Sequence, residues 1–245
     1  MALLLRERTF VVLSTVVLVC FCLNGAVGDE QVLNRYGSFM GWTYRTGVTS
    51  LDFLVSDRHA KYRVLRKSGA TAAYISRGGK QGAVVGFNPS VWALDIHDKR
   101  VTLPASAAKE FVSEVTIFSN DLSAVPHTDR GNPPQMPDAE IFTFSPPSGA
   151  PFDLWINRET GQPVIAVIDM NPKRVFLTPI SFYSNANGMR FITRWQREDK
   201  SFVVVSKIAL NAKVHDSDVD PLAIEKKGRA SKQTLANLDR CIYPR

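Results

Sequence analysis

Cysteine is scarce in this chain of 245 residues, which contains only three. Cys20 and Cys22 lie close to the N-terminus and Cys241 lies close to the C-terminus, and the long stretch between them has none. That stretch can form neither an internal disulfide nor a cysteine metal site. Its fold must therefore depend on an apolar core, which a chain of this length can bury.

Long hydrophobic runs are also scarce, and the conspicuous one, Phe10–Leu23, carries no charge. It is shorter than the roughly 20 apolar residues of a membrane-spanning helix. Arginines precede it, and Ala26 and Gly28 are small residues at the −3 and −1 positions before Asp29. This pattern is typical of a signal peptide. It predicts removal of residues 1–28 and a periplasmic or secreted protein with no stable membrane span after cleavage; an uncleaved anchor helix is the alternative.

The positive charge is unevenly distributed. The formal net charge is +7, and Ala223–Arg245 contributes +4 of it, from six basic and two acidic residues. In Asp29–Leu222, 22 basic residues stand against 20 acidic ones, so the body is nearly neutral. Because nucleic-acid binding needs a basic face on the folded domain, we expect no nucleic-acid partner. We expect residues 212–245 to form a basic, disordered tail.

Two segments, Asp29–Trp42 and Pro104–Phe118, have the apolar spacing of three and four residues that is typical of an amphipathic helix. In the second, polar residues are expected on the face opposite to the apolar stripe: Lys109, Glu110, Ser113 and Glu114. The rest of the body is rich in short β-type segments. Eleven strands are expected, at Leu51–Ser56, Lys61–Lys67, Thr71–Ser76, Ala83–Phe87, Val91–Ile96, Glu140–Phe144, Phe152–Asn157, Pro163–Asp169, Arg174–Tyr183, Met189–Glu198 and Phe202–Asn211.

Several expected strands alternate apolar and polar residues, as strands of a sheet with one wet face do. In one strand Phe152, Leu154 and Ile156 share a side, opposite to Trp155. A second strand shows the same pattern on Trp92, Leu94 and Ile96. Strands in near succession, without crossover helices, indicate an antiparallel meander. We therefore expect an α+β fold in residues 29–211: a single curved antiparallel sheet, a half-barrel of about 9–11 strands, with two covering helices.

Motifs that carry chemistry are missing from this body. It has no Gly-rich phosphate loop, no His-Glu-x-x-His and no Gly-x-Ser-x-Gly. The histidines stand far apart in expected turns and loops: His59, His97, His127 and His215. The sequence around Asp216, Asp218 and Asp220 lacks the Gly and Glu of a calcium loop, and Glu159 has no carboxylate partner nearby in the sequence. We therefore assign no catalytic residue, no metal ligand and no cofactor, and we leave the ligand-binding residues open.

Three short motifs resemble one known family. Phe144–Pro163 has a proline- and glycine-rich stretch followed by Leu-Trp-Ile-Asn and a Thr-Gly turn. Gly86–Trp92 is similar to a Gly-Phe-Asp-Gly-x-x-x-Trp hairpin, and Lys207–Ala212 is similar to a final strand. In this order the motifs resemble the N-terminal, non-catalytic region of exported bacterial retropepsin-like aspartic proteases. The resemblance covers Asp29–Pro221.

The protease domain that follows in this family is missing. An aspartic protease needs two aspartates that share a proton, each in an Asp-Thr/Ser-Gly motif. No Asp in the chain is followed by Thr-Gly or Ser-Gly, and only 24 residues follow Pro221. The resemblance therefore implies a truncated or split, non-catalytic family member that is not an enzyme. Its expected partner is a separately encoded protease domain.

The expected half-barrel also resembles periplasmic lipoprotein carriers, which hold acyl chains in the concavity of a sheet. The alternative function is therefore a periplasmic carrier or binding protein for a hydrophobic, acyl-chain ligand. An apolar cavity of a few hundred Å³ that opens to solvent would favour this alternative. Helices that fill the concavity would argue against a ligand.

Overall fold

The computed structural model describes residues 30–42, 47–120, 122–170 and 173–227. The predicted signal peptide (residues 1–28) and the last part of the predicted tail (residues 228–245) lie outside the described residues.

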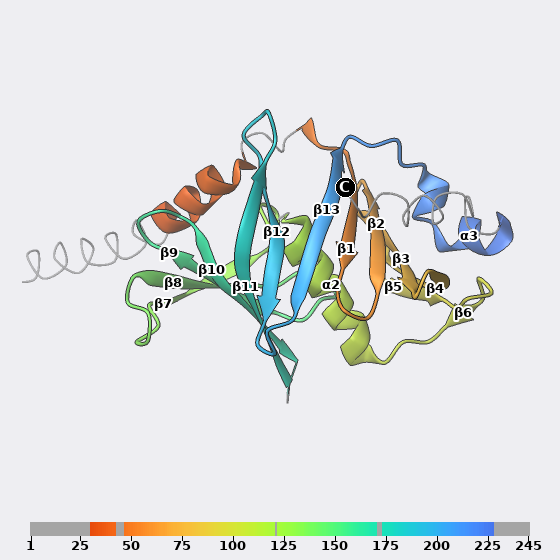
Figure 1. The fold of residues 1–245 in the computed structure, drawn as a ribbon, viewed down its shortest axis with the longest axis horizontal. Helices are drawn as coiled ribbons and strands as arrows, with labels where there is room; N and C mark the ends of the chain where they lie inside the picture. Colours follow the sequence, from red (N-terminus) through yellow and green to blue (C-terminus); the bar gives the residue numbers. More distant parts are fainter. Residues whose placement is uncertain (1–29, 43–46, 121, 171–172, 228–245) are drawn as a thin grey trace, which may run out of the picture.

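The main feature of the fold is one antiparallel sheet of 13 strands that bends around a helix (Figure 1). In chain order the strands are β1 (Ser50–Ser56), β2 (Lys61–Lys67), β3 (Ala70–Arg77), β4 (Lys80–Phe87), β5 (Val91–Leu94), β6 (Arg100–Val101), β7 (His127–Gly131), β8 (Ala139–Phe144), β9 (Phe152–Asn157), β10 (Pro163–Met170), β11 (Lys173–Ser184), β12 (Arg190–Arg197) and β13 (Phe202–Leu210). Their order across the sheet is β6-β5-β4-β3-β2-β1-β13-β12-β11-β10-β9-β8-β7. The sheet thus consists of two meanders, β1–β6 and β7–β13, joined by the pairing of β1 with β13.

The predicted fold class is confirmed, because the sheet is single, antiparallel and open, and few helices cover it. All eleven predicted strands are present. The two additional strands, β6 and β7, form the two edges of the sheet. β6 has only two residues and both are exposed, and β7 reads His-Thr-Asp-Arg-Gly. Neither carries the alternation of apolar residues that identifies a strand in a sequence.

One strand is shorter than predicted. β5 ends at Leu94, and Ile96 is 59% exposed instead of sharing the buried side of Trp92 and Leu94. The chain turns at Asp95, whose carboxylate accepts hydrogen bonds from the backbone N–H groups of His97 and Lys99. An Asp that bonds its own downstream backbone favours a turn over a strand.

Helix α2 (Ala105–Ser119) connects the two edges of the sheet, since it follows β6 and precedes β7. It crosses one face of the sheet, which we call the inner face (Figure 1). The helix matches the predicted segment, but Ser113 does not lie on the expected polar face. Ser113 is fully buried, because its hydroxyl group donates a hydrogen bond to the backbone carbonyl of Ala150 at 2.7 Å.

The main core lies between α2 and the inner face. β9 alternates strictly, with Phe152, Leu154 and Ile156 buried and Trp155 only half-buried on the other side, as predicted. The helix contributes Phe118, whose ring centroid lies 6.3 Å from that of the fully buried Trp195 on β12.

The opposite, outer face is covered over β2–β5 by the segment that follows β13. This segment contains the 3-10 helix η2 (Asp216–Asp218) and the helix α3 (Pro221–Lys227). It buries Val214, Val219 and Ile224 in a second apolar cluster, together with Leu65, Ala72, Tyr74, Val84, Trp92 and Leu94 of the sheet. Residues 212–227, which the sequence analysis placed in the tail, therefore pack on the sheet. Their apolar residues are too few and too irregularly spaced to indicate this from the sequence.

A helix at residues 30–40 closes one end of the inner face, beside the turn between β9 and β10. It buries Val32, Tyr36 and Met40. The Tyr36 hydroxyl group donates a hydrogen bond to Oδ1 of Asn120, at the end of α2, at 2.8 Å. A Cβ atom on Gly161 would lie 2.4 Å from the backbone carbon of Arg35, so this turn requires glycine. Among the described helices, none has the length and apolar composition of a membrane span.

Candidate ligand-binding site

The inner face beside α2 is an apolar surface of the sheet that borders empty space. On β1, Leu51, Phe53 and Val55 are buried on this face, and on the adjacent β2 Val64 is buried there too. Two cavities border these strands. Leu51 lines one cavity, and Val55 lines the other. Phe53 stands between the two positions on the same strand, so its buried side chain separates them.

The cavity at Val55 lies directly under α2 and has a volume of about 40 Å³. Its walls are mainly apolar and include Val64, Ala73, Phe111, Val115, Phe118 and Val203. Ligand pockets in proteins usually measure about 300–1,000 Å³. In this structure α2 therefore fills most of the concavity, which is the arrangement that the sequence analysis expected to argue against a ligand. A large ligand enters only if the helix moves away from the sheet.

Four polar side chains stand at one end of the cavity under α2: Asp57, Tyr62, Glu114 and Arg197. A guanidinium nitrogen of Arg197 lies 3.3 Å from a carboxylate oxygen of Glu114 on α2, and 4.0 Å from one of Asp57 in the β1–β2 turn. Glu114 faces the sheet here, although the sequence analysis expected it on the solvent face of the helix. This ion-pair cluster, Asp57–Arg197–Glu114, links α2 to two strands.

Tyr62 lines the same end of the cavity and has a raised pKa. Burial of the phenol, together with the negative charges of Asp57 and Glu114, raises this pKa to about 12. Arg77 and Arg197 oppose the shift. Tyr62 is therefore a neutral hydrogen-bonding group at physiological pH.

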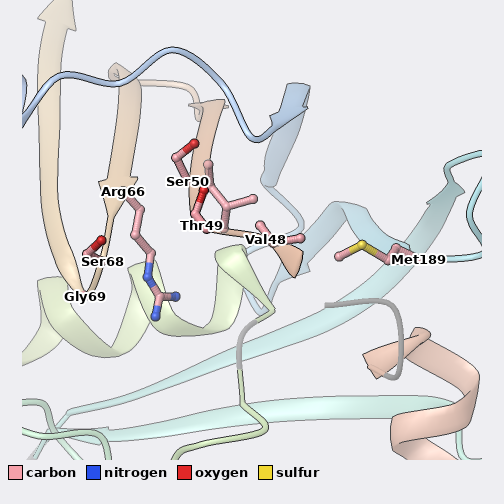
Figure 2. Close-up of a pocket in the computed structure, with 8 residues that line it drawn as sticks. Val48, Thr49, Ser50, Arg66, Ser68, Gly69 and Met189 are labelled. Atoms are coloured by element: carbon pink, nitrogen blue, oxygen red, sulfur yellow. The ribbon is translucent and has the colours of Figure 1, made fainter. Parts of the chain in front are cut away.

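The cavity at Leu51 is larger, at about 290 Å³, and we call it the Arg66 cavity (Figure 2). Val48 and Met189 face each other across it from different parts of the chain, and Arg66 extends from β2 toward the side on which α2 lies. Arg66 is on the same face of β2 as Val64, because residues two apart on a strand point the same way. The Arg66 cavity thus continues the inner face beyond the end of α2.

A third space, the polar cleft, has a volume of about 550 Å³. It lies where the β1–β2 and β12–β13 turns meet the start of β11, and it is lined by arginines and carboxylates, including Arg58, Arg174 and Asp199. Asp57 and Arg197 line both this cleft and the cavity under α2. The ion-pair cluster thus forms the wall between a charged cleft and an apolar cavity.

Most of the residues that the sequence analysis considered for chemistry lie away from these spaces, but His59 lines the polar cleft. All four histidines are exposed. Glu159 is exposed in the β9–β10 turn, where the side chain of Asn157 accepts hydrogen bonds from the backbone N–H groups of Glu159 and Thr160. Asp218 accepts a hydrogen bond from the backbone of His215 in η2. Across the described residues, no group of three His, Cys, Asp or Glu side chains is placed to hold a metal ion.

The sequence analysis did not find Asp57, Tyr62, Glu114 and Arg197. Each reads as an ordinary surface residue in its own segment. Glu114 and Arg197 are 83 positions apart in the sequence, and only the passage of α2 across the inner face brings them together. A charge at a position that flanks the apolar stripe of a covering helix is the only signal that could have indicated this contact.

Comparison with known proteins finds likeness in structure only. No known family and no curated protein matches the chain. A LolA-superfamily protein from Nitrosomonas europaea has a TM-score of 0.52 at 13% identity, over 78% of this chain and 97% of that chain. A domain from Vibrio parahaemolyticus described as an outer membrane lipoprotein-sorting protein has a TM-score of 0.51 at 9% identity, over 82% of this chain and 99% of that chain. At these identities the likeness concerns the fold, a LolA-like half-barrel.

The predicted resemblance to retropepsin-like proteases is wrong, since the similar solved structures are a LolA-superfamily protein and a lipoprotein-sorting protein domain, and not proteases. The motif residues have structural roles instead. Leu154 and Ile156 are buried core residues of β9, Asn157 bonds the following turn, and Gly161 lies against the helix at residues 30–40. Any buried strand with a tight turn selects such residues, so the motifs do not identify a protease.

Proposed function

We propose that the protein is an exported, periplasmic or secreted, carrier or binding protein for a hydrophobic ligand that contains an acyl chain. The observation that carries this proposal is the apolar inner face of an open sheet that one helix covers, with a cavity along it on each side of Phe53. The names of the two structural neighbours support the same class of ligand. The signal-peptide pattern of residues 1–28 supports the location.

Ligand entry requires movement of α2, because the cavity under the helix is about 40 Å³ in volume. Movement of the helix would break its polar ties and its core contacts through Ile117 and Phe118. No side chain caps its N-terminus, and its polar ties to the rest of the chain include the ion pair of Glu114 with Arg197 and the hydrogen bond from Ser113 to Ala150. An acyl chain that replaced the contacts of α2 with the inner face would keep that face covered, so the apolar burial would be retained.

We also propose that the protein is not an enzyme, since the residues considered for catalysis lie apart on the surface. Purified protein should hydrolyse no peptide above background between about pH 3 and pH 8, where carboxylates and histidines titrate. Pepstatin-sensitive cleavage by a preparation free of other proteases would contradict this proposal.

The ligand-binding proposal is tested by titration of the purified protein with dansylated undecanoic acid, followed by the dansyl fluorescence. Val203 lines the cavity under α2, and the next residue, Val204, lies on the outer face and is 37% exposed. We expect Val203→Phe to weaken binding at least about tenfold, which corresponds to roughly 1.4 kcal/mol. Val204→Phe is the matched control and should change binding less than twofold.

The variant Val203→Ala guards against misfolding, because it enlarges the cavity and should strengthen binding instead of weakening it. Thermal melts of the three variants separate a loss of binding from a loss of fold. Absence of saturable binding to the wild-type protein, or an equal effect of Val203→Phe and Val204→Phe in folded proteins, would overturn the proposed function.

A further inference from the structure

The polar cleft brings together three arginines from separate parts of the chain. Arg58 belongs to the β1–β2 turn, Arg174 to β11 and Arg197 to the end of β12. Asp57, Glu198 and Asp199 line the same space. The cleft therefore offers groups of both charge signs in nearly equal number, in a volume of about 550 Å³.

The ion pairs in the cleft are easily exchanged. Arg58 lies 3.2 Å from Asp199, with side-chain exposures of 61% and 47%, and Arg174 lies 3.2 Å from Asp169, with exposures of 64% and 53%. Exposed pairs of this kind contribute little to stability, because solvent screens them. A phosphate group can take a guanidinium from a carboxylate at little cost, because it forms paired, charge-assisted hydrogen bonds with arginine.

Arg197 is less exposed, at 28%, and it is shared between Glu114 and Asp57. Removing a guanidinium from this cluster would leave half-buried carboxylates without a counter-charge, which is costly. A ligand that brings both a phosphate and an ammonium group avoids this cost. The phosphate would pair with the arginines while the ammonium group paired with the carboxylates, so every charge would keep a partner.

From this arrangement we propose that the polar cleft binds the zwitterionic phosphate–ammonium head group of the ligand, while its acyl chain lies under α2. This inference rests on the proposed function and adds the class of ligand. Asp57 and Arg197 line both spaces, so displacement of this shared wall would let a molecule with its head group in the cleft pass its chain into the apolar cavity. Exchange of partners at Arg197 would also release Glu114 and with it α2, which couples head-group binding to chain entry.

The test compares ligands that share one acyl chain and differ in the head group. Lysophosphatidylethanolamine is zwitterionic, lysophosphatidylglycerol is anionic and monoacylglycerol is uncharged; free phosphoethanolamine has the head group without the chain. Affinities are measured by displacement of dansylated undecanoic acid and by native mass spectrometry. We expect the zwitterionic lipid to bind at least about tenfold more tightly than the uncharged one, and free phosphoethanolamine to bind at least about a hundredfold more weakly than the zwitterionic lipid.

The double variant Arg58→Ala/Arg174→Ala should reduce this head-group preference to less than about threefold and leave the affinity for monoacylglycerol unchanged. The matched control is Arg130→Ala, which removes an equally exposed arginine that pairs with Asp153 at the far edge of the sheet. Three results would overturn the inference: an equal affinity for all three lipids, a preference for the anionic lipid, or a preference that survives the double variant. In each case, binding of monoacylglycerol would still uphold the proposed function. Free phosphoethanolamine that bound as tightly as the lipid would also overturn the inference, because the cleft would then be a small-molecule site. Binding of none of the lipids would mean that the proposed function itself fails.

Discussion

The two halves of the sheet are covered in different ways. In the first half, β1–β6, both faces are covered over β2–β5, the inner one by α2 and the outer one by residues 212–227. In β7–β13 the inner face is buried, while Ile180, Tyr183 and Val204 are exposed on strands β11 and β13. Burial along the strands follows this difference. The first five residues of β3 are buried without interruption, whereas β9 alternates residue by residue. A strand between two covers has no wet side, so it needs no polar alternation.

The two halves of the sheet can therefore have different roles in ligand binding. Residues 212–227 stay on the outer face of the first half when α2 leaves its inner face, so this half can keep its shape. The cavity under α2 is formed largely by residues of this half, among them Val55, Val64 and Ala73. We therefore expect the C-terminal segment to stabilise the wall against which a ligand binds.

The largest expected effect comes from removing a side chain beneath the outer cover. Leu94 is fully buried in the cluster that residues 212–227 complete. Leu94→Ala should lower the free energy of unfolding by about 2–5 kcal/mol. Val204→Ala changes an exposed side chain on the outer face of the other half, and it should change the free energy by less than about 0.5 kcal/mol. Urea denaturation measures both, and similar values for the two variants would mean that the outer faces are equally covered.

The next effect concerns the other half, at the contact between the β9–β10 turn and the helix at residues 30–40. Gly161 has φ +71°, and a Cβ atom there would meet the backbone of Arg35. Gly161→Ala should cost about 2–4 kcal/mol, from the positive φ and from overpacking. Gly78→Ala is the matched control, since Gly78 has φ +56° with no atom within 4 Å of the added Cβ. If the two variants are equally stable in thermal denaturation, the close approach of the helix is incorrect.

A smaller effect is expected where the same helix meets the end of α2. Tyr36→Phe removes the hydroxyl group that bonds Oδ1 of Asn120, and both residues are buried. A buried acceptor without its donor costs about 1–3 kcal/mol. Chemical denaturation of the purified variant checks this value. Unchanged stability would place the Tyr36 hydroxyl group in solvent.

The smallest effect concerns alkaline pH. The pKa of Tyr62 is raised from its ordinary value of 10.0 to about 12, so the folded state holds this proton more tightly than the unfolded state does. Its contribution to stability is complete below pH 10 and is lost as the pH rises toward 12. The absorbance of tyrosinate at alkaline pH follows the titration. The Tyr62→Phe variant should lack a phenol that titrates near pH 12 and should lose less stability over this range. An identical pH profile in wild type and variant would contradict the assignment.

The strands that form the inner face could be predicted from the sequence better than the edge strand β7 and the segment on the outer face. Residues such as Phe152, Leu154 and Ile156 repeat at a period of two, which a sheet with one wet face imposes, and glycines mark the turns. The edge strand β7 and residues 212–227 lack such a pattern, because a few irregular contacts hold them. The ion-pair cluster of Arg197 with Glu114 was not predictable, since it depends on where α2 crosses the sheet. The resemblance to retropepsin-like proteases was wrong because strand-and-turn residues of this kind recur in unrelated proteins.

Whether an acyl chain binds between α2 and the inner face is tested most directly with a spin-labelled fatty acid and the methyl resonances of the protein. If the chain lies between α2 and the inner face, the label should broaden the methyl signals of Val55, Val64 and Val203, which line the cavity under the helix. The signals of Val204, on the outer face, and of Leu94, beneath the C-terminal segment, should stay sharp. Broadening confined to Val204 and Leu94, or no broadening of any of these signals at saturating fatty acid, would contradict the account.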